Sequence, residues 1–312
     1  MCAVLVTQGY LLWRRHRPAS PPPRPPAEAS AGRLHPPSAD ALARFAFYSD
    51  CSIPHQSRIT RLREALAESC SAEDLDCLYH LLITCPRPAK ESEGHWFVLA
   101  NDLMSQLCRR DPDAGRFTRQ FLAVMGDASR NPVLRDYAVQ HLAAWVDPRR
   151  QAPRGATVPA GGIIALRRSV ITSMAKTAID PTLASTTVPG TVLMALVNIS
   201  RVDASVCSGA FETLRPWITK ALADGSNLSM PVRVSIIHAA AAAAPANYLP
   251  AFRAIAYRRE AAPALRLAAI AAIAANGDKS DLDPIRAIPA DTPALAFAAK
   301  DATRVLSARM GT

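Results

Sequence analysis

Residues 263–278 read PALRLAAIAAIAANGD, and residues 230–243 read MPVRVSIIHAAAAA. Proline stands at or next to the start of each stretch, where a helix makes no use of the missing N–H and the fixed φ of proline is already helical. Alanine and branched aliphatic residues follow at helical spacing, so each helix has an apolar face with little bulk. Gly277 marks the expected end of the first helix. These stretches predict short helices that pack closely.

The same kind of start recurs along the chain at Pro132, Pro189 and Pro293. Pro231, Pro263 and Pro293 are 32 and 30 residues apart, and a regular period of this length is typical of stacked helical repeats. Each start is preceded by another segment with helical spacing, within residues 115–125, 163–175, 207–223, 248–257 and 282–288. The pattern predicts five antiparallel helix pairs joined by short polar turns.

Residues 115–146, GRFTRQFLAVMGDASRNPVLRDYAVQHLAAWV, resemble one full HEAT repeat. Residues 263–278 are similar to the second helix of the HEAT-like repeats of bilin-lyase proteins, which opens with proline, an apolar residue and arginine. The resemblance covers roughly residues 112–308 and is interrupted by an insertion at 147–161. It implies an all-α fold, an α-solenoid of antiparallel HEAT-like helix pairs, over a repeat region at 111–312.

An N-terminal helical region at 38–110 is expected before the repeats. Four serines there indicate helix starts: Ser38 for a helix through Tyr48, Ser57, Ser71 in a capping box with Asp74, and Ser92 for a helix through Cys108. This region resembles the repeat family only in being helical.

Residues 1–17 contain the apolar run CAVLVTQGYLLW followed by three arginines. Twelve helical residues rise about 18 Å, less than the ~30 Å hydrocarbon core of a membrane. Aromatic and then basic residues after an apolar run are typical of the interfacial end of a membrane helix. We expect a partial membrane anchor here; a disordered or interfacial terminus is the alternative.

Residues 18–37 contain eight prolines and predict an extended, semi-rigid linker. A proline-rich spacer after an N-terminal anchor indicates a helical domain that faces outward from the membrane, as in a bacterial envelope. The arginines that follow the apolar run favour the cytoplasmic side instead. We expect a membrane-associated protein with the outward orientation.

The net charge is +10, of which residues 1–37 carry +4. The remaining +6 makes nucleic-acid binding an alternative, but such binding requires charge clustered on one face. Two arginine pairs are the candidate partner surface: Arg167, Arg168, Arg258 and Arg259. An ordinary solvated surface explains most such residues equally well.

Five of the seven cysteines lie close together in the sequence: Cys51, Cys70, Cys77, Cys85 and Cys108. None forms C-x-x-C, and their spacing fits no zinc motif. They are expected to be buried thiols, or to form disulfides if the compartment is oxidising.

The sequence contains no P-loop, no dinucleotide-binding fingerprint, no G-x-S-x-G and no H-E-x-x-H. We therefore expect no catalytic, cofactor-binding or metal site. The predicted function is a non-enzymatic protein–protein interaction scaffold tethered to a membrane. Nucleic-acid binding, as in HEAT-like DNA glycosylases, and bilin-lyase-like enzyme activity are the alternatives that the resemblance implies.

Overall fold

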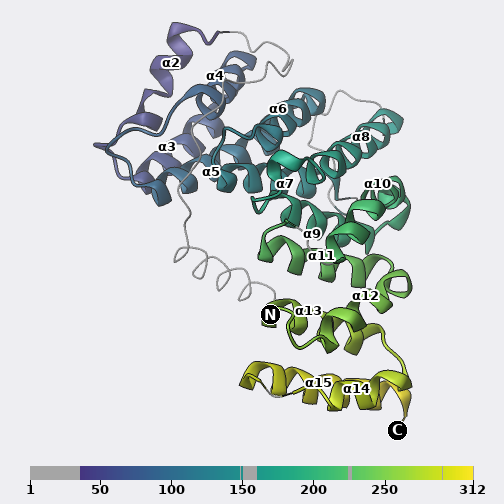
Figure 1. Cartoon of the computed structure of the whole chain (residues 1–312). Coiled ribbons are helices and arrows are strands. Elements are labelled where there is room, and N and C mark those ends of the chain that lie inside the picture. The colour runs from purple at the N-terminus through teal and green to yellow at the C-terminus, as the bar shows by residue number, and fades with distance from the viewer. Residues whose placement is uncertain (1–35, 148, 150–159, 224–226, 290, 312) are drawn as a thin grey trace.

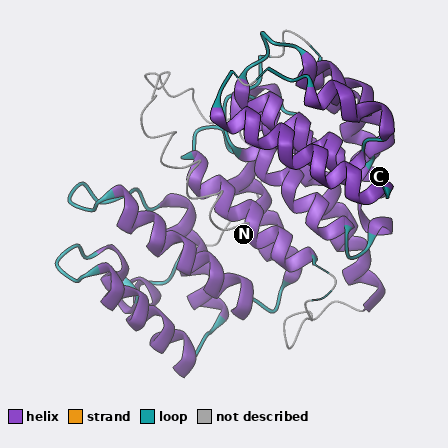
Figure 2. Ribbon diagram, turned by 90° about the horizontal axis from the view of Figure 1, so that it is seen from below, coloured by secondary structure: helices purple, strands orange, loops and turns teal. Residues whose placement is uncertain are grey.

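The computed structural model describes residues 36–147, 149, 160–223, 227–289 and 291–311. Within these ranges the chain forms helices and no strand (Figure 2). The prediction of an all-α chain is confirmed. The expected anchor at 1–17, most of the linker at 18–37 and most of the insertion at 147–161 lie outside the described residues.

The N-terminal helices are α2 (Ala39–Arg44), η1 (Ala46–Ser49, a 3-10 helix), α3 (His55–Glu68), α4 (Ala72–Thr84) and α5 (Glu93–Arg110). The central helices are α6 (Ala114–Gly126), α7 (Pro132–Val146), α8 (Ala160–Ala178), η2 (Pro181–Leu183), α9 (Val188–Ser200) and α10 (Ala204–Leu222). The C-terminal helices are α11 (Met230–Ala243), α12 (Pro245–Tyr257), α13 (Pro263–Asn276), η3 (Lys279–Asp281), α14 (Leu282–Arg286) and α15 (Pro293–Met310).

The odd-numbered helices from α3 to α15 form a row in which each packs on the next. Helices α4, α6, α8, α12 and α14 pack on the odd-numbered helix that follows each of them, and α10 packs on both α9 and α11. The chain advances along this row from α2 at one end to α15 at the other (Figure 1). One apolar face of each helix is thereby covered by its neighbours.

The proline-led helix starts are confirmed with small shifts. Pro132, Pro263 and Pro293 are the first residues of α7, α13 and α15. Helices α9 and α11 begin one residue earlier than predicted, so Pro189 and Pro231 are second. Both positions lie in the first turn, where an N–H has no partner inside the helix.

The serine caps are confirmed at three of the four predicted positions. Ser38 and Ser92 accept from the backbone N–H groups of Ala41 and His95, and Ser71 forms the predicted capping box with Asp74. The prediction at Ser57 is wrong: α3 begins at His55 after Pro54, which presets an extended turn without a side-chain cap. The helix from Ser38 also ends at Arg44 rather than Tyr48, and η1 follows it.

Close approach explains two glycines. A side-chain carbon at Gly190 of α9 would lie 2.8 Å from the Ser235 hydroxyl of α11, so this contact requires the small residue. Gly277 ends α13 as predicted, but its φ of −71° is ordinary rather than left-handed. There the constraint is space, because an added carbon would lie 2.5 Å from the Asp281 carboxylate.

Three buried arginines occupy the same position in their helices. Arg58, Arg135 and Arg266 are the fourth residues of α3, α7 and α13, and are 2%, 1% and 1% exposed. Each donates to the backbone carbonyl ten residues earlier: Tyr48 at 3.1 Å, Met125 at 2.8 Å and Ala256 at 3.3 Å. These carbonyls lie at helix ends, where backbone acceptors lack partners within the helix. Each arginine therefore joins its helix to the preceding one.

Two of these arginines also reach a carboxylate beside the next odd-numbered helix. Arg58 forms an ion pair with Glu91, the residue before the cap of α5. Arg266 pairs with Asp291 at 3.1 Å, the residue before the cap of α15. Among the described residues, no carboxylate lies within ion-pair distance of Arg135. The buried arginine in the middle of the row thus lacks the paired carboxylate that the buried arginines nearer the two ends have.

Candidate functional site

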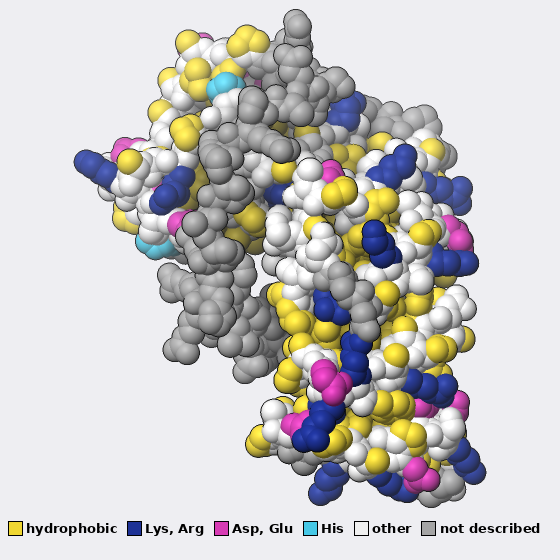
Figure 3. Space-filling view, viewed as in Figure 1, with side chains coloured by type: hydrophobic (Ala, Val, Ile, Leu, Met, Phe, Trp, Pro, Cys, Tyr) yellow, Lys and Arg dark blue, Asp and Glu magenta, His cyan; other side chains and the backbone are white. Residues whose placement is uncertain are grey.

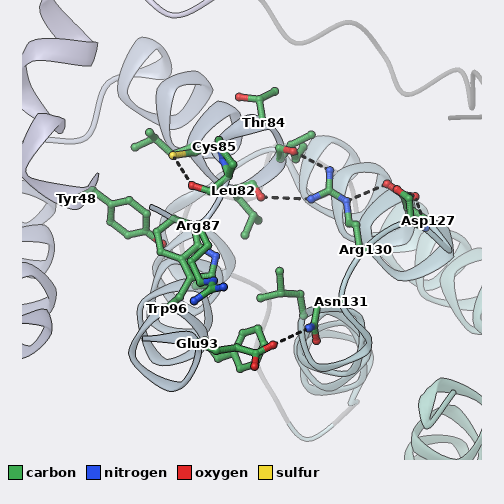
Figure 4. Close-up of a pocket in the computed structure, with 17 residues that line it drawn as sticks. Tyr48, Leu82, Thr84, Cys85, Arg87, Glu93, Trp96, Asp127, Arg130 and Asn131 are labelled. Atoms are coloured by element: carbon green, nitrogen blue, oxygen red, sulfur yellow. Dashed lines mark hydrogen bonds and ion pairs between the residues drawn. The ribbon is translucent and has the colours of Figure 1, made fainter. Parts of the chain in front are cut away.

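A cavity of about 450 Å³ opens between the end of α4, the start of α5 and the loop before α7 (Figure 4). We call it the α4–α5–α7 pocket. Its lining consists of Tyr48, residues 81–87, Glu93, Trp96, Phe97 and Ala100 of α5, and Asp127, Ser129, Arg130, Asn131 and Leu134. Its volume falls within the usual range for ligand pockets in proteins.

The apolar part of the lining is held by helix packing. Trp96 and Phe97 come from α5 and are 6% and 8% exposed. The Tyr48 ring meets Trp96 edge to face, with 5.7 Å between ring centroids. Burial raises the pKa of the Tyr48 hydroxyl far above its ordinary value, so this group stays neutral at physiological pH. The apolar wall is therefore uncharged.

Arg130 forms the opposite side of the pocket (Figure 4). Its guanidinium donates to the carbonyls of Leu82 at 3.5 Å and Ile83 at 2.8 Å, in the last turn of α4. Its Nε lies 3.1 Å from the Asp127 carboxylate. A cation at a helix C-terminus satisfies free carbonyls and stabilises the helix dipole. Arg130 is thus a fixed structural group.

The floor between these sides is closed by a pair that links α5 to α7. The Asn131 amide donates to Glu93 at 3.1 Å, and the Asn131 side-chain oxygen caps α7 through the N–H of Val133. Asn131 therefore has both ends of its amide in use. The pair holds the starts of the two helices at a fixed separation.

Arg87 lies at the mouth between Pro86 and Pro88 and is exposed. One terminal nitrogen donates to the Glu91 carbonyl at 2.7 Å, which closes the loop on itself. Two flanking prolines limit the backbone freedom of this loop. Arg87 and Trp96 share one side of the pocket in Figure 4.

Cys85 brings a thiol to the pocket wall. Its sulfur lies 3.3 Å from the Ser49 hydroxyl and is half-buried. It is a free thiol in the structure, as are Cys51, Cys70, Cys77, Cys108 and Cys207. Burial raises the pKa of the Cys77 and Cys207 thiols to about 11, so these two are poor nucleophiles at neutral pH.

Two stacked histidines next to the Arg58–Glu91 pair are a feature that the sequence did not reveal. The His55 and His95 rings lie 3.9 Å apart, and Nδ1 of His95 is 3.4 Å from the Glu91 carboxylate. No set of three or more histidine, cysteine or acidic side chains in the described ranges has the arrangement of a metal site. His55 lies in α3 and His95 in α5, so no local sequence motif relates the two residues.

The four predicted surface arginines do not form one patch. Arg167 and Arg168 lie on α8, whereas Arg258 and Arg259 follow α12, which is separated from α8 by α10 and α11 in Figure 1. Arg167 lies over the Trp145 ring at 5.8 Å, and Arg259 lies 3.4 Å from Asp291. Of the four, Arg168 and Arg259 are exposed and the other two are half-buried.

A second cavity of about 400 Å³ lies between the ends of α8 and α10. Trp217 and Lys220 of α10 face Asp180, whose carboxylate is already bonded to the N–H and hydroxyl of Thr182. Trp96 and Trp145, by contrast, are buried in the core. Trp217 is half-buried and is the tryptophan most available to a ligand among these three.

Comparison of the chain with protein-family models, with curated proteins and with solved structures gave no match. None of the helices in the described part of the chain has both the length and the apolar character needed to cross a membrane. Function must therefore be argued from the residues and their geometry.

Proposed function

We propose that the chain is a HEAT-like α-solenoid that acts as a non-enzymatic scaffold and binds a protein partner. The row of odd-numbered helices supports this proposal, because each packs on the next from α3 to α15. The buried arginine of α3, α7 and α13 supports it as well. In each helix the guanidinium donates to the backbone carbonyl ten residues earlier in the chain. Stacked helical units present long continuous surfaces, which suit protein partners.

Two surfaces of this row are available to a partner. One is the α4–α5–α7 pocket. The other lies over α11 and α13, where hydrophobic side chains gather between cations (Figure 3). Ala271 and His238 are exposed residues of α13 and α11. Membrane tethering through residues 1–17, with an outward-facing helical domain, remains part of the proposal and rests on the sequence alone.

Nucleic-acid binding is the weaker alternative. It requires clustered cations, but the two predicted arginine pairs lie on separate helices and Arg259 is paired with an acid. Bilin-lyase-like activity has no residue that we can assign to it.

Site-specific photo-crosslinking in the cells that make the protein tests the scaffold proposal. A photoreactive residue replaces Thr84 at the pocket, Ala271 on α13, or Glu212 on α10; all three positions are exposed. We expect one discrete protein adduct from Thr84 or Ala271 and none from Glu212. The captured protein, once purified, must bind the chain at low micromolar concentration.

Three results would contradict the proposal. They are equal adducts from all three positions, no adduct from any of them, and adducts that nuclease treatment removes. The last result supports the nucleic-acid alternative, and duplex DNA binding should then weaken steeply as salt rises.

A further inference from the structure

We propose that the α4–α5–α7 pocket binds a carboxylate carried on an apolar group, and that Arg87 is the residue that anchors it. This inference rests on the proposed function, since it names the chemistry that a partner would present. The free C-terminus of a protein with an apolar last residue has this chemistry. So does a small free carboxylic acid.

The polar groups around the pocket are almost all committed to each other. Arg130 is held by two carbonyls and Asp127, and the Asn131 amide by Glu93 and the start of α7. The Asp127 carboxylate accepts from the backbone N–H and hydroxyl of Ser129, at 3.0 and 2.6 Å. The Thr84 hydroxyl donates to its own helix at 2.7 Å. A ligand would have to break these bonds to use these groups.

Arg87 differs from them. Within the described chain it makes one hydrogen bond, from one terminal nitrogen to the Glu91 carbonyl. Arg87 is an exposed residue of the pocket lining. A guanidinium offers two parallel donors that match the two oxygens of a carboxylate. The one uncommitted donor at the mouth therefore selects a planar anion.

The backbone bond also places this donor. Because Arg87 lies between Pro86 and Pro88 and its side chain is tied to Glu91, its guanidinium is confined beside Trp96 (Figure 4). An anchor that is already ordered loses less side-chain entropy when a ligand binds.

The apolar part of the lining selects the rest of the ligand. Trp96, Phe97 and Leu134 form an apolar surface, and a cavity of about 450 Å³ has room for one large side chain rather than an extended peptide. An apolar group against this wall and a carboxylate on Arg87 satisfy both parts of the site. The Glu93 carboxylate also lines the pocket and accepts from the Asn131 amide at 3.1 Å.

Alkylation of Cys85 provides a readout, because its half-buried sulfur belongs to the pocket wall. The full chain is treated with a maleimide, and labelling of each cysteine is followed by mass spectrometry. The probes are 4-phenylbutanoate, its amide, and a pentapeptide ending in phenylalanine with a free or amidated C-terminus. Cys70 and Cys108, half-buried elsewhere, are internal controls. Isothermal titration with the same four probes gives affinities independently.

We expect an acid probe to slow labelling of Cys85 alone and to bind at least about tenfold more tightly than its amide, the scale of a charge-assisted bidentate contact. Arg87→Gln should reduce this ratio to below about twofold. Arg61→Gln removes another exposed arginine, on α3, and should leave the ratio unchanged. Protection by the free-acid peptide identifies a protein terminus, and protection by phenylbutanoate alone identifies a small acid.

Equal binding of acid and amide would overturn the inference, as would an acid preference that survives Arg87→Gln. Its failure is distinct from that of the scaffold proposal. If Ala271 captures a partner while the pocket ignores carboxylates, only the pocket inference is lost. If no position captures a protein but phenylbutanoate protects Cys85, the scaffold proposal is lost and the carboxylate site stands.

Discussion

The two ends of the helical row and its middle bury the same residue in different electrostatic surroundings. Near the ends, Arg58 faces Glu91 and Arg266 faces Asp291. In the middle, Arg135 is equally buried but has only a hydrogen bond to the Met125 carbonyl in the described residues. Burial correspondingly lowers the pKa of Arg135. The hydrogen bond to the preceding helix is thus common to all three, whereas the ion pair is optional.

This difference separates two roles of a buried arginine. The bond to a helix-end carbonyl satisfies an acceptor that the helix leaves free. The carboxylate offsets the cost of removing the charge from water. Where the second role is missing, the buried charge itself lowers stability more, and the three arginines should respond unequally to the same substitution.

The largest effect is expected from Arg58→Met. It leaves Glu91, 6% exposed, as a buried carboxylate with only the His95 ring beside it, and should lower the free energy of unfolding by about 3–5 kcal/mol. Arg135→Met leaves no carboxylate without an ion-pair partner. It should change the free energy of unfolding by less than about 1 kcal/mol, because only the hydrogen bond to the Met125 carbonyl is lost. Urea unfolding followed by circular dichroism measures both.

Arg266→Met should fall between the two. Its partner Asp291 is 29% exposed at the side chain and also contacts Arg259, so that acid keeps water and a second cation after the substitution. Arg304→Met, at an exposed pair with Asp301, is the surface control and should cost under about 0.5 kcal/mol. Equal costs for Arg58→Met and Arg135→Met would contradict the distinction between paired and unpaired sites.

Two glycines at helix ends predict the second largest effect. Gly277→Ala, at the end of α13, would place a methyl group 2.5 Å from the Asp281 carboxylate and 2.7 Å from the Ile273 carbonyl. Such crowding should cost about 1–3 kcal/mol. Gly126→Ala, at the end of α6 beside the Arg135 acceptor, meets no atom within 4 Å. It should instead stabilise the chain by about 0.5–1 kcal/mol, because alanine favours the helix.

Thermal unfolding of the two variants tests both predictions. The melting temperature should fall for Gly277→Ala and rise for Gly126→Ala. Gly209→Ala in α10 also meets no atom within 4 Å and provides a second stabilising control. A loss at Gly126 as large as that at Gly277 would mean that conformational freedom, rather than space, explains both glycines.

Adding an acid to the middle of the row should bring it closer to the ends. Glu91 and Asp291 directly precede the caps of α5 and α15, and the residue that precedes the Thr187 cap of α9 is Thr186. Thr186→Glu should therefore stabilise the chain by about 1 kcal/mol, since it offers Arg135 a carboxylate. Thr186→Gln has a similar shape without the charge.

A double-mutant cycle decides whether the gain comes from Arg135. In the Arg135→Met background, the benefit of Thr186→Glu should disappear. A benefit that persists there would come from the start of α9 alone, where any acidic residue favours the helix dipole.

The sequence supports prediction of the helices and their order, because proline starts, capping residues and apolar spacing act within a few residues. An arginine follows the repeated proline at Arg135, Arg233 and Arg266, but the pattern does not predict burial, since Arg233 is half-buried. Arg58 was missed, since a start at Ser57 would place it at the beginning of the helix rather than in its fourth position. Nothing local in the sequence relates Arg58 to Glu91, because 33 residues separate them.

The α4–α5–α7 pocket could not be predicted from the sequence for the same reason. Arg87, Trp96 and Arg130 meet only because three helices end or begin at one place. The pair at Arg167 and Arg168 was expected to share a surface with Arg258 and Arg259, yet α8 and α12 are separate in the row. Charge composition gives no information on such distances. Local residue patterns therefore predict the helices well, but they predict poorly which helices lie next to one another.

The smallest expected effect concerns the acid that follows Arg135. Burial raises the pKa of Asp136, and hydrogen bonds from Thr187 and Thr191 offset this only in part. The folded chain thus holds the Asp136 proton more tightly than the unfolded chain does. Below both pKa values the site has no effect on stability. As pH rises from the unfolded pKa through the folded pKa, ionisation of Asp136 progressively lowers the free energy of unfolding. Asp136→Asn should remove that loss, improving relative to wild type by up to about 1 kcal/mol between pH 3 and pH 8. Urea unfolding across this range measures the difference, and Asp301→Asn, at an exposed site, should show little of it. A pH-independent effect of Asp136→Asn would mean that the carboxylate keeps its ordinary pKa, and that Arg135, despite lacking a direct ion pair, compensates its neighbour through space.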